Sequence, residues 1–355
     1  MTADYKKELD DLISIVIKEG GSDLHLSEGR QPILRVAGSL IPLVKHPVLS
    51  RADMKGVLDQ ILDPIKKDIF IEKKEVDFAY DHNSESRFRG NAYFQLGKMS
   101  MALRYIQKSI RTLNELKLPP ILETFTNKQQ GFFLVAGPTG HGKSTTLASM
   151  IEMVNNTRLE HIITIEDPIE YIFQSKKAII DQREVSQDTP DFHTALKGMF
   201  RQDVDVVMIG EMRTAEDMSA AVTAAETGHL VFSTLHTNNA AQTIDRIVDS
   251  FDSGQQDQIS FQLSATLLGI MSQRLIPRIS GGLIPACELL INNSAVSNLI
   301  RENRTHEINS VIETSGDQSM IDLNRYLSNL VRSGEITIED AYLYSQNTKG
   351  LERML

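Results

Sequence analysis

The first part of the chain combines one helical pattern with short strand-like segments. Apolar residues near the start recur at the spacing of one helix face, namely Leu9, Leu12, Ile13 and Val16. Further along, apolar and polar residues alternate over 33–36 and 88–94, which is typical of half-buried strands. This mixture predicts an α+β domain, which we expect to cover residues 1–112.

A different pattern follows the proline pair Pro119-Pro120, which disfavours a continuing helix. We therefore expect a linker over 113–123 and a second domain over 124–355. In this second domain, helix-like segments separate short apolar runs, which cover 132–136, 162–165, 204–209 and 230–235. Strands that alternate with helices predict a parallel sheet covered on both faces, which binds ligands at the carboxyl ends of its strands.

The last part of the chain follows a helical pattern. One set of apolar residues that shares a helix face is Leu263, Leu267, Ile270 and Met271, and a second set is Leu323, Leu327, Leu330 and Val331. We therefore predict that residues 257–355 are mostly helical. The second domain would then be an α/β domain with a helical C-terminal part.

The segment after the first apolar run carries the most specific chemical signal. Residues 137–145 read GPTGHGKST and fit the phosphate-loop pattern G-x-x-x-x-G-K-[ST] between a strand and a helix. Its glycines allow backbone N–H groups to converge on a phosphate, Lys143 can reach the β- and γ-phosphates, and the Ser144 hydroxyl can ligate Mg²⁺. The predicted nucleotide-binding residues are Gly137, Pro138, Thr139, Gly140, His141, Gly142, Lys143, Ser144 and Thr145. The chain is thus predicted to bind a nucleoside triphosphate.

Acidic residues follow two other predicted strands. Glu211 comes directly after an apolar run, where a carboxylate can hold Mg²⁺ through water or orient the attacking water. Glu166, Asp167 and Glu170 follow the run at 162–165. Three acids this close can also form only a solvated loop, but beside a phosphate loop their convergence favours a role in the site.

Two histidines flank the apolar run 230–235. His229 precedes it and His236 follows it, so they would lie at opposite ends of one strand. A single histidine is usually a core or surface residue, whereas histidines beside a triphosphate can bind or sense the γ-phosphate. Thr214 and Asp217 have the spacing of a helix capping box, which predicts a structural role for Asp217.

Composition narrows the class of protein. The chain has 355 residues, of which 41% are hydrophobic, enough for two domains with their own cores. Its single cysteine, Cys287, excludes a disulfide framework and a four-cysteine zinc site. We expect a cytoplasmic protein, because no apolar run approaches the roughly 18–20 residues that span a bilayer and the start lacks a signal-peptide pattern. The net charge of −10 argues against a broad nucleic-acid surface, so we expect no nucleic acid as a partner.

Several ordered motifs resemble the secretion ATPase superfamily and, more narrowly, the PilT-type retraction motors of type IV pili. The motifs are SDLHLSEG at 22–29, EDPIEY at 166–171, DVVMIGEMR at 205–213, TAAETGHLVFSTLHT at 223–237 and AVSNLIRE at 295–302. The last is similar to the family's AIRNLIRE, with Val296-Ser297 in place of Ile-Arg. The resemblance runs from about residue 5 to about residue 345, which is nearly the whole chain.

The resemblance implies a PAS-like α+β N-terminal domain followed by a RecA-like P-loop ATPase domain. It also implies a homo-hexamer at the inner face of the cytoplasmic membrane that hydrolyses ATP with Mg²⁺. The motor would drive pilus retraction, that is, pilin disassembly and twitching motility. Its implied partner is an inner-membrane pilus platform protein, with room for a paralogous motor ATPase.

The resemblance also assigns roles by motif position. Residues 137–145 correspond to the Walker A loop, the acidic cluster ending in Glu170 to the Asp box, and Glu211 to the Walker B glutamate. His229 and His236 correspond to the His box, and the implied metal ligands are Ser144, Glu170 and Glu211. The family's N-terminal domain supplies arginines to a neighbour's nucleotide, for which the candidates are Arg87, Arg89 and Arg104. Each of these arginines is also readable as part of an exposed basic strand face.

Some positions depart from the family pattern. His141 stands where Ser is usual, Val204 where Pro is usual, and Thr214 where Asp is usual, although Thr214 still suits a helix cap. The His141 ring is either a neutral bystander or, in the sharper alternative, a cation whose pKa is raised by phosphate charge.

Three alternative functions stay open at this point. The change at Val296-Ser297 leaves room for an accessory paralogue of the PilU kind. An assembly or type II secretion ATPase usually carries a four-cysteine zinc module, which a single cysteine cannot form. A nucleotide-gated binding module with slow hydrolysis is disfavoured because Glu170 and Glu211 are both present.

Overall fold

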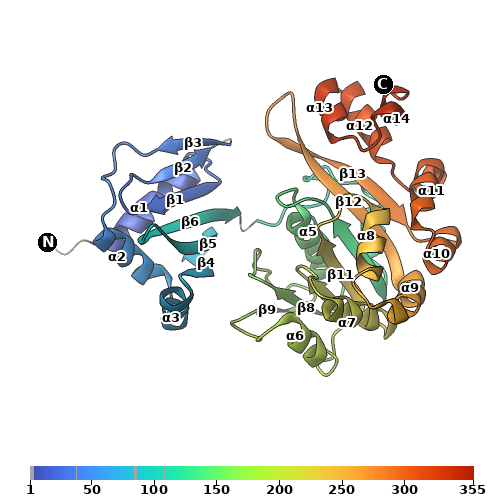
Figure 1. Cartoon of the computed structure of the whole chain (residues 1–355), viewed down its shortest axis with the longest axis horizontal. Helices are drawn as coiled ribbons and strands as arrows, with labels where there is room; N and C mark the ends of the chain where they lie inside the picture. Colours follow the sequence, from blue (N-terminus) through green and yellow to red (C-terminus); the bar gives the residue numbers. More distant parts are fainter. Residues whose placement is uncertain (1–3, 37, 84–85, 108) are drawn as a thin grey trace. The chain divides into compact units, whose positions relative to one another are not determined.

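Two units make up the chain in the computed structural model, which describes residues 4–36, 38–83, 86–107 and 109–355. Unit 1 comprises Met1–Ser109 and Pro168–Ile172, and unit 2 comprises Ile110–Asp167 and Phe173–Leu355. Each unit contains one β-sheet and its own helices (Figure 1). The mixed α/β class predicted from the sequence is therefore confirmed.

Unit 1 is built on an antiparallel sheet whose strands run in the order β3-β2-β1-β6-β5-β4. Its strands are β1 (Asp23–Ser27), β2 (Ile33–Val36), β3 (Ser39–Pro42), β4 (Glu75–Asn83), β5 (Ser86–Gln95) and β6 (Lys98–Gln107). Its helices are α1 (Tyr5–Lys18), α2 (Arg51–Ile61) and α3 (Pro64–Lys73).

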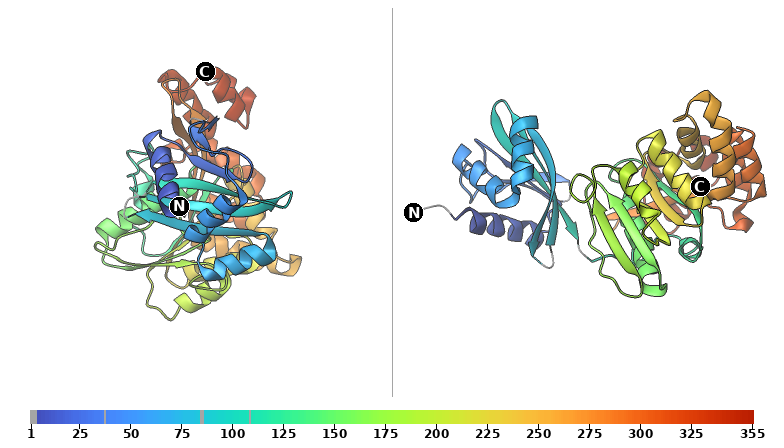
Figure 2. Two further views of the ribbon diagram at one scale, coloured as in Figure 1. Left: turned by 90° about the vertical axis from the view of Figure 1, so that its left-hand side faces the viewer. Right: turned by 90° about the horizontal axis from the view of Figure 1, so that it is seen from below.

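The core of unit 1 lies between its helices and one face of its sheet (Figure 2). Helix α1 buries the four residues that the helical spacing predicts, namely Leu9, Leu12, Ile13 and Val16. They pack with alternate strand residues such as Leu24, Leu26 and Leu103, because side chains two positions apart share one face of a strand. The opposite face of the sheet is left for polar side chains.

Unit 2 is built on a sheet with the strand order β13-β12-β7-β11-β10-β8-β9. Its strands are β7 (Gly131–Ala136), β8 (His161–Glu166), β9 (Ile179–Glu184), β10 (Val206–Ile209), β11 (Leu230–Leu235), β12 (Leu267–Pro277) and β13 (Leu283–Ile291). All pairings are parallel except that between β12 and β13, which is antiparallel. The apolar runs that predict strands at 132–136, 162–165 and 230–235 all lie within this sheet, and the run at 204–209 contains β10.

The helices of unit 2 cover the sheet and extend to the C-terminus. They are α4 (Leu122–Thr126), α5 (Lys143–Thr157), α6 (Phe192–Met199), α7 (Ala215–Glu226), α8 (Ala240–Val248), α9 (Ser253–Thr266), α10 (Ser294–Arg301), α11 (Ile308–Thr314), α12 (Leu323–Arg332), α13 (Ile338–Tyr344) and α14 (Thr348–Glu352), with the 3₁₀ turns η1 (Thr305–Glu307) and η2 (Gly316–Gln318). No helix in the described ranges is long and apolar enough to cross a membrane.

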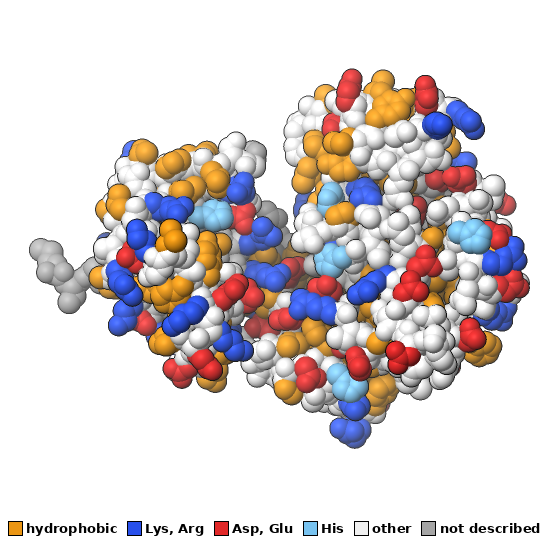
Figure 3. Space-filling model, viewed as in Figure 1, with side chains coloured by type: hydrophobic (Ala, Val, Ile, Leu, Met, Phe, Trp, Pro, Cys, Tyr) orange, Lys and Arg blue, Asp and Glu red, His pale blue; other side chains and the backbone are white. Residues whose placement is uncertain are grey.

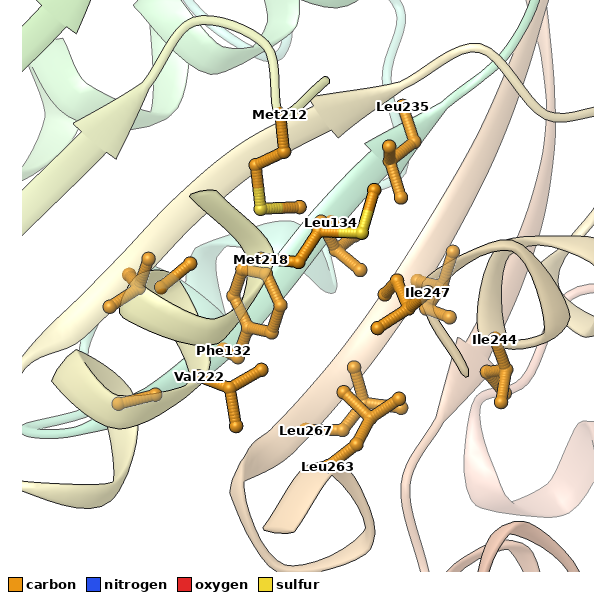
Figure 4. Close-up of a cluster of buried hydrophobic side chains, with 14 of the residues drawn as sticks. Phe132, Leu134, Met212, Met218, Val222, Leu235, Ile244, Ile247, Leu263 and Leu267 are labelled. Atoms are coloured by element: carbon orange, nitrogen blue, oxygen red, sulfur yellow. The ribbon is translucent and has the colours of Figure 1, made fainter. Parts of the chain in front are cut away.

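The core of unit 2 joins the middle of the sheet to helices α7, α8 and α9. Phe132 and Leu134 of β7 lie against Met218 and Val222 of α7, with Ile247 of α8 beside them (Figure 4). Strands β7 and β11 are buried along their whole length, because both faces of a parallel sheet are covered. Functional side chains of such strands are therefore confined to their ends.

The helical prediction for residues 257–355 is wrong between α9 and α10. Helix α9 ends at Thr266, and the apolar runs that follow form β12 and β13 instead. Periodicity does not separate a buried strand from a buried helix, because a strand covered on both faces is apolar throughout. The second helical set is confirmed, since Leu323, Leu327 and Leu330 are buried on α12.

Acidic and basic side chains are interspersed on the molecular face drawn in Figure 3. The whole chain carries a net charge of −10, but on this face the negative side chains do not form a separate region. Charges of both signs that alternate over a face neutralise one another locally, so they do not create the single-sign field that attracts a polyanion.

Candidate functional site

The predicted phosphate loop connects the carboxyl end of β7, an inner strand of the sheet, to the N-terminus of α5. Gly137, Gly140 and Gly142 have φ values of 145°, 81° and 82°, which glycine adopts far more easily than other residues. Gly137 also has a neighbour too close for a side chain, because a Cβ there would lie 2.4 Å from the carbonyl oxygen of Gln273. The glycines of the motif are therefore required by the shape of the loop.

Lys143 lies folded over this loop. Its Nζ donates to the carbonyl oxygens of Gly137 at 2.8 Å and Pro138 at 3.0 Å, and the residue is buried. The loop and the first turn of α5 present backbone N–H groups and the positive end of the helix dipole. An ammonium group and a helix N-terminus that converge in this way form a site for a phosphate group.

A histidine and a glutamate from neighbouring strands meet beside Lys143. His236, which follows β11, has Nδ1 3.1 Å from Lys143 Nζ and 3.2 Å from Thr139 Oγ1. Its Nε2 lies 3.2 Å from Oε1 of Glu211, which follows β10. The carboxyl ends of β7, β10 and β11 thus bring the loop, a histidine and a carboxylate together, as expected for a parallel sheet.

An arginine that the sequence reasoning did not single out holds the acidic residues at this edge. Arg213 Nη2 lies 3.2 Å from Glu211 Oε2, and its Nη1 lies 3.3 Å from Asp167 Oδ2. The signals of Arg213 in the sequence are its place two residues after Glu211 and at the end of the motif DVVMIGEMR at 205–213. The neighbouring Glu166 accepts from the hydroxyl of Thr164 at 2.7 Å and is buried.

The structure does not bring His229 to the loop. His229 precedes β11, its Nδ1 lies 2.9 Å from the carbonyl oxygen of Ala224, and its ring packs edge-on against Phe200 at 5.5 Å. Its backbone carbonyl accepts from the N–H of Gly131, at the amino end of β7. The six residues of β11 therefore separate the two histidines, which corresponds to roughly 20 Å of extended chain.

The three candidate arginines share one face of the sheet in unit 1. Arg87 and Arg89 alternate on β5, and Arg104 of β6 lies opposite Arg89 in the strand register. Arg87 is buried, and it donates to Asp81 at 2.8 Å and to the carbonyl oxygen of Ile169 at 3.2 Å. The Arg104 side chain is 64% exposed, with its Nε 2.9 Å from Asp23 Oδ1.

Glu170 lies in Pro168–Ile172, which belongs to unit 1. Its Oε1 is 3.4 Å from Arg89 Nη1, so it forms an ion pair with the arginine face. Glu211, in contrast, lies in unit 2 with the phosphate loop. The grouping of Glu170, Glu211 and Ser144 as metal ligands stays a prediction.

Comparison with known proteins settles the family. A family model described as type II/IV secretion system protein matches residues 3–342. The chain belongs to this family. It is 41% identical over 334 residues to the type IV pilus retraction ATPase PilT of Pseudomonas aeruginosa. The aligned region covers 94% of this chain and 97% of PilT.

Two further comparisons extend over almost the full length of the chain. The type IV pilus ATPase PilU of Pseudomonas aeruginosa is 40% identical over 349 residues, covering 98% of this chain and 91% of PilU. A crystal structure of the pilus retraction motor PilT with bound ADP is 43% identical and matches with a TM-score of 0.90, covering 97% of this chain and 99% of that chain. The resemblance inferred from the motifs is therefore confirmed.

His141, where this family member departs from the usual loop sequence, faces strand β12. Its Nδ1 accepts the backbone N–H of Leu275 at 2.8 Å, and its ring lies edge-on to Tyr344 with the centroids 6.4 Å apart. Burial, and then the nearby charges of Arg274 and Lys143, lower the pKa of His141. This direction opposes the alternative in which the ring is a cation.

Gln273 is a second loop contact that the sequence reasoning missed. Its Nε2 donates to the carbonyl oxygen of His141 at 2.8 Å, and its Oε1 accepts from the hydroxyl of Thr146 at 2.7 Å. The residue lies on β12, in the run that periodicity predicts to be helical. No nearby motif marks it, because its partners lie more than a hundred positions away in the chain.

The donor set at the loop suits Mg²⁺ better than a metal that needs a complete protein cage. Among the residues that the structure describes, no group of three or more His, Cys, Asp and Glu side chains forms a ready metal site. Mg²⁺ usually retains several waters and binds through one or two protein oxygens together with substrate phosphates. The Ser144 hydroxyl and the Glu211 carboxylate provide oxygen donors of this kind.

Proposed function

We propose that this chain is a motor ATPase that couples ATP hydrolysis to the retraction of type IV pili. The observation that carries the proposal is the similarity to PilT, at 41% identity over 94% of the chain. The fold supports it independently of single motifs, since the PilT–ADP structure matches with a TM-score of 0.90. The convergence of Lys143, His236 and Glu211 at one sheet edge supplies the chemistry.

In the proposed mechanism, the loop N–H groups and the N-terminus of α5 bind the phosphates. The Lys143 ammonium exchanges its contacts with the carbonyl oxygens of Gly137 and Pro138 for the β- and γ-phosphates. Ser144 and Glu211 would hold Mg²⁺, which neutralises charge on the phosphates when it is bound. Glu211 orients the attacking water, and His236 contacts the γ-phosphate from its position between Lys143 and Glu211.

The proposed assembly is a homo-hexamer in which unit 1 of one subunit completes the nucleotide site of the next. Arg89 and Arg104 are the candidates for this contact, because their side chains are 40% and 64% exposed. Arg87 is less suitable, since it is buried and already bonded to Asp81. The motor would act at the inner face of the cytoplasmic membrane on the pilus platform protein, and Glu170 would join the site as a further acid.

An accessory motor of the PilU kind is the second candidate. The chain is 40% identical to PilU, almost the value for PilT, so overall identity does not separate the two. The motif at α10 favours the second candidate. The hydroxyl of Ser297, where the retraction motif has Arg, lies 3.0 Å from the carbonyl oxygen of Ser264 and 3.0 Å from Asn292 Oδ1, and its one proton can be donated to either. This chain therefore has, at position 297, a short side chain bonded within unit 2 in place of the long charged side chain of the retraction motif.

Deletion of the gene, with surface pili and twitching scored, tests the proposal. Excess pili that do not retract are expected for a retraction motor. Retraction should be restored by a plasmid copy of the wild-type gene and not by a copy that carries Lys143→Ala. Bald cells would instead indicate an assembly motor. Normal retraction after deletion, together with ATP hydrolysis by the purified chain, would favour the accessory candidate.

A further inference from the structure

Strand β12 is longer than β7, the strand that pairs with one of its two edges. Its parallel pairing with β7 ends at Ser272 and Ala136, whereas β12 itself continues to Pro277. Beyond that point the phosphate loop lies beside β12, as the approach of Gly137 to the Gln273 carbonyl shows. Alternate residues of a strand present their backbone groups to the same edge, so the N–H of Leu275 points to the loop as well.

His141 provides the acceptor that this edge requires. Its Nδ1 accepts the Leu275 N–H at 2.8 Å, in the place where the carbonyl of a neighbouring strand would lie. A backbone N–H only donates, so the bond requires Nδ1 to be unprotonated, with the ring proton on Nε2. Together with the bond from Gln273 to the His141 carbonyl, this contact ties the middle of the loop to β12.

Serine, the residue usual at this position in the family, does not reach the same place. Its hydroxyl oxygen lies two bonds from Cα, whereas the Nδ1 of histidine lies three bonds away. The amide oxygen of asparagine also lies three bonds from Cα and accepts hydrogen bonds without titrating. An asparagine at position 141 therefore reproduces the acceptor without the imidazole.

We propose that His141 is a positioning residue of the phosphate loop, whose neutral imidazole replaces the missing strand partner of β12 and holds the loop ready for a nucleoside triphosphate. This inference rests on the proposed function, because it assigns a task within the same nucleotide site. The imidazole acts on the phosphates through the backbone of the loop, and its contact with Tyr344 of α13 restricts the ring on a second side.

The charged groups around the ring favour its neutral form. The charges of Lys143, at the start of α5, and Arg274, on β12, act on the ring, and the Tyr344 ring of α13 packs edge-on against it. His236 contacts Lys143, with its Nδ1 3.1 Å from Lys143 Nζ. Partial burial, and then the charges of Arg274 and Lys143, lower the pKa of His141, which favours the neutral ring that the bond to Leu275 requires. Protonation in acid removes this acceptor and breaks the bond to Leu275, which leaves the bond from Gln273 to the His141 carbonyl to tie the loop to β12.

Binding of a fluorescent ATP analogue to the purified full chain tests this inference. The variants are His141→Ser, which removes the acceptor, and His141→Asn, which retains one. At about pH 8 the serine variant should bind about 3- to 10-fold more weakly than wild type, the factor that one net hydrogen bond supplies, and the asparagine variant should restore most of the affinity. His306→Ser, a change at a side chain that is 77% exposed, is the matched control.

The pH profile separates positioning from a general structural role. The pKa of His141 is lowered, so the comparison needs a pH well below the ordinary histidine value of about 6.5, such as about pH 4.5. At that pH wild type should approach the serine variant, whereas His141→Asn should bind more tightly than wild type. Equal affinity of the asparagine and serine variants, or a ratio of wild type to asparagine that does not change with pH, would overturn the inference. If the serine variant does not fold, the ratio between wild type and the asparagine variant still decides.

Failure of the proposed function would give a different result. Lys143→Ala should abolish most binding of the analogue if the loop is a nucleotide site. Wild type that does not bind would refute the nucleotide site itself. Wild type that binds, with Lys143→Ala impaired and all His141 variants equal to wild type, would refute only the role of His141.

Discussion

The two sheets of this protein use charged side chains in different ways. In unit 1, charges lie on one face of an antiparallel sheet and pair across the strands, as Arg104 does with Asp23. In unit 2, the parallel strands are covered on both faces, and charged groups such as Glu211 and His236 gather where the strands end. The position of a charged residue relative to the end of a strand therefore indicates function in unit 2. In unit 1 the same kind of residue is equally suited to a surface ion pair.

The largest expected effect tests whether the arginine face of unit 1 is more than a solvated surface. Arg89→Ala or Arg104→Ala should lower ATP hydrolysis by about 10³-fold if that arginine acts on a neighbour's nucleotide, because it stabilises charge in the transition state. Mixing the inactive arginine variant with Lys143→Ala should restore part of the activity, since each subunit supplies what the other lacks.

The control for this prediction is Arg87→Ala. Arg87 is buried and bonded to Asp81 and to the Ile169 carbonyl, so its loss should mainly lower the free energy of unfolding. Full specific activity in a preparation that light scattering shows to be monomeric would contradict the role in trans. The arginine face would then be only a surface.

The second prediction concerns the edge of the sheet in unit 2. Glu211→Gln should leave binding of ATP intact and lower its hydrolysis by about 10²-fold, because water positioning or general-base assistance is lost. Steady-state hydrolysis and equilibrium binding, measured with Mg²⁺ present, separate the two effects. Glu302→Gln, at an exposed residue, is the matched control. Unchanged hydrolysis in Glu211→Gln would show that the assignment of this glutamate is wrong.

Which features of the fold and the site can be predicted from the sequence depends on whether they are local or join distant segments. Local patterns are sufficient for the strands β7, β8, β10 and β11, the glycines of the phosphate loop and the capping box of Thr214 and Asp217, which the structure confirms. Contacts between distant segments are different, because no periodicity or spacing encodes them. The bond from Leu275 to His141 joins residues 134 positions apart, in a segment whose apolar run resembles a buried helix.

The third prediction uses a buried carboxyl group on the antiparallel strand of unit 2. Glu288 of β13 accepts the backbone N–H of Ala240 at 2.8 Å, and burial raises its pKa to about 7. A carboxyl whose pKa is higher in the folded state stabilises the fold below its ordinary value, and that contribution is lost as the pH rises through about 7.

The free energy of unfolding of wild type should therefore contain a term that falls by roughly 2 kcal/mol between about pH 5 and about pH 8. Glu288→Gln retains the acceptor and cannot ionise, so this term should be absent from the variant. Denaturant unfolding over this pH range measures the difference. Parallel pH profiles of wild type and variant would show that the Glu288 carboxyl titrates normally.

The smallest expected effect compares the two ends of a single strand. His236 follows β11 and contacts Lys143 and Glu211, so His236→Ala should lower ATP hydrolysis by about 10-fold, the value of one hydrogen bond to a charged group. His229 precedes β11 and is bonded to the Ala224 carbonyl, so His229→Ala should mainly lower the free energy of unfolding, by about 1 kcal/mol. Hydrolysis rates and denaturant unfolding of both variants test this difference. A larger loss of hydrolysis in His229→Ala would mean that the amino end of the strand also takes part in the chemistry, and the rule that unit 2 concentrates function at one edge would fail.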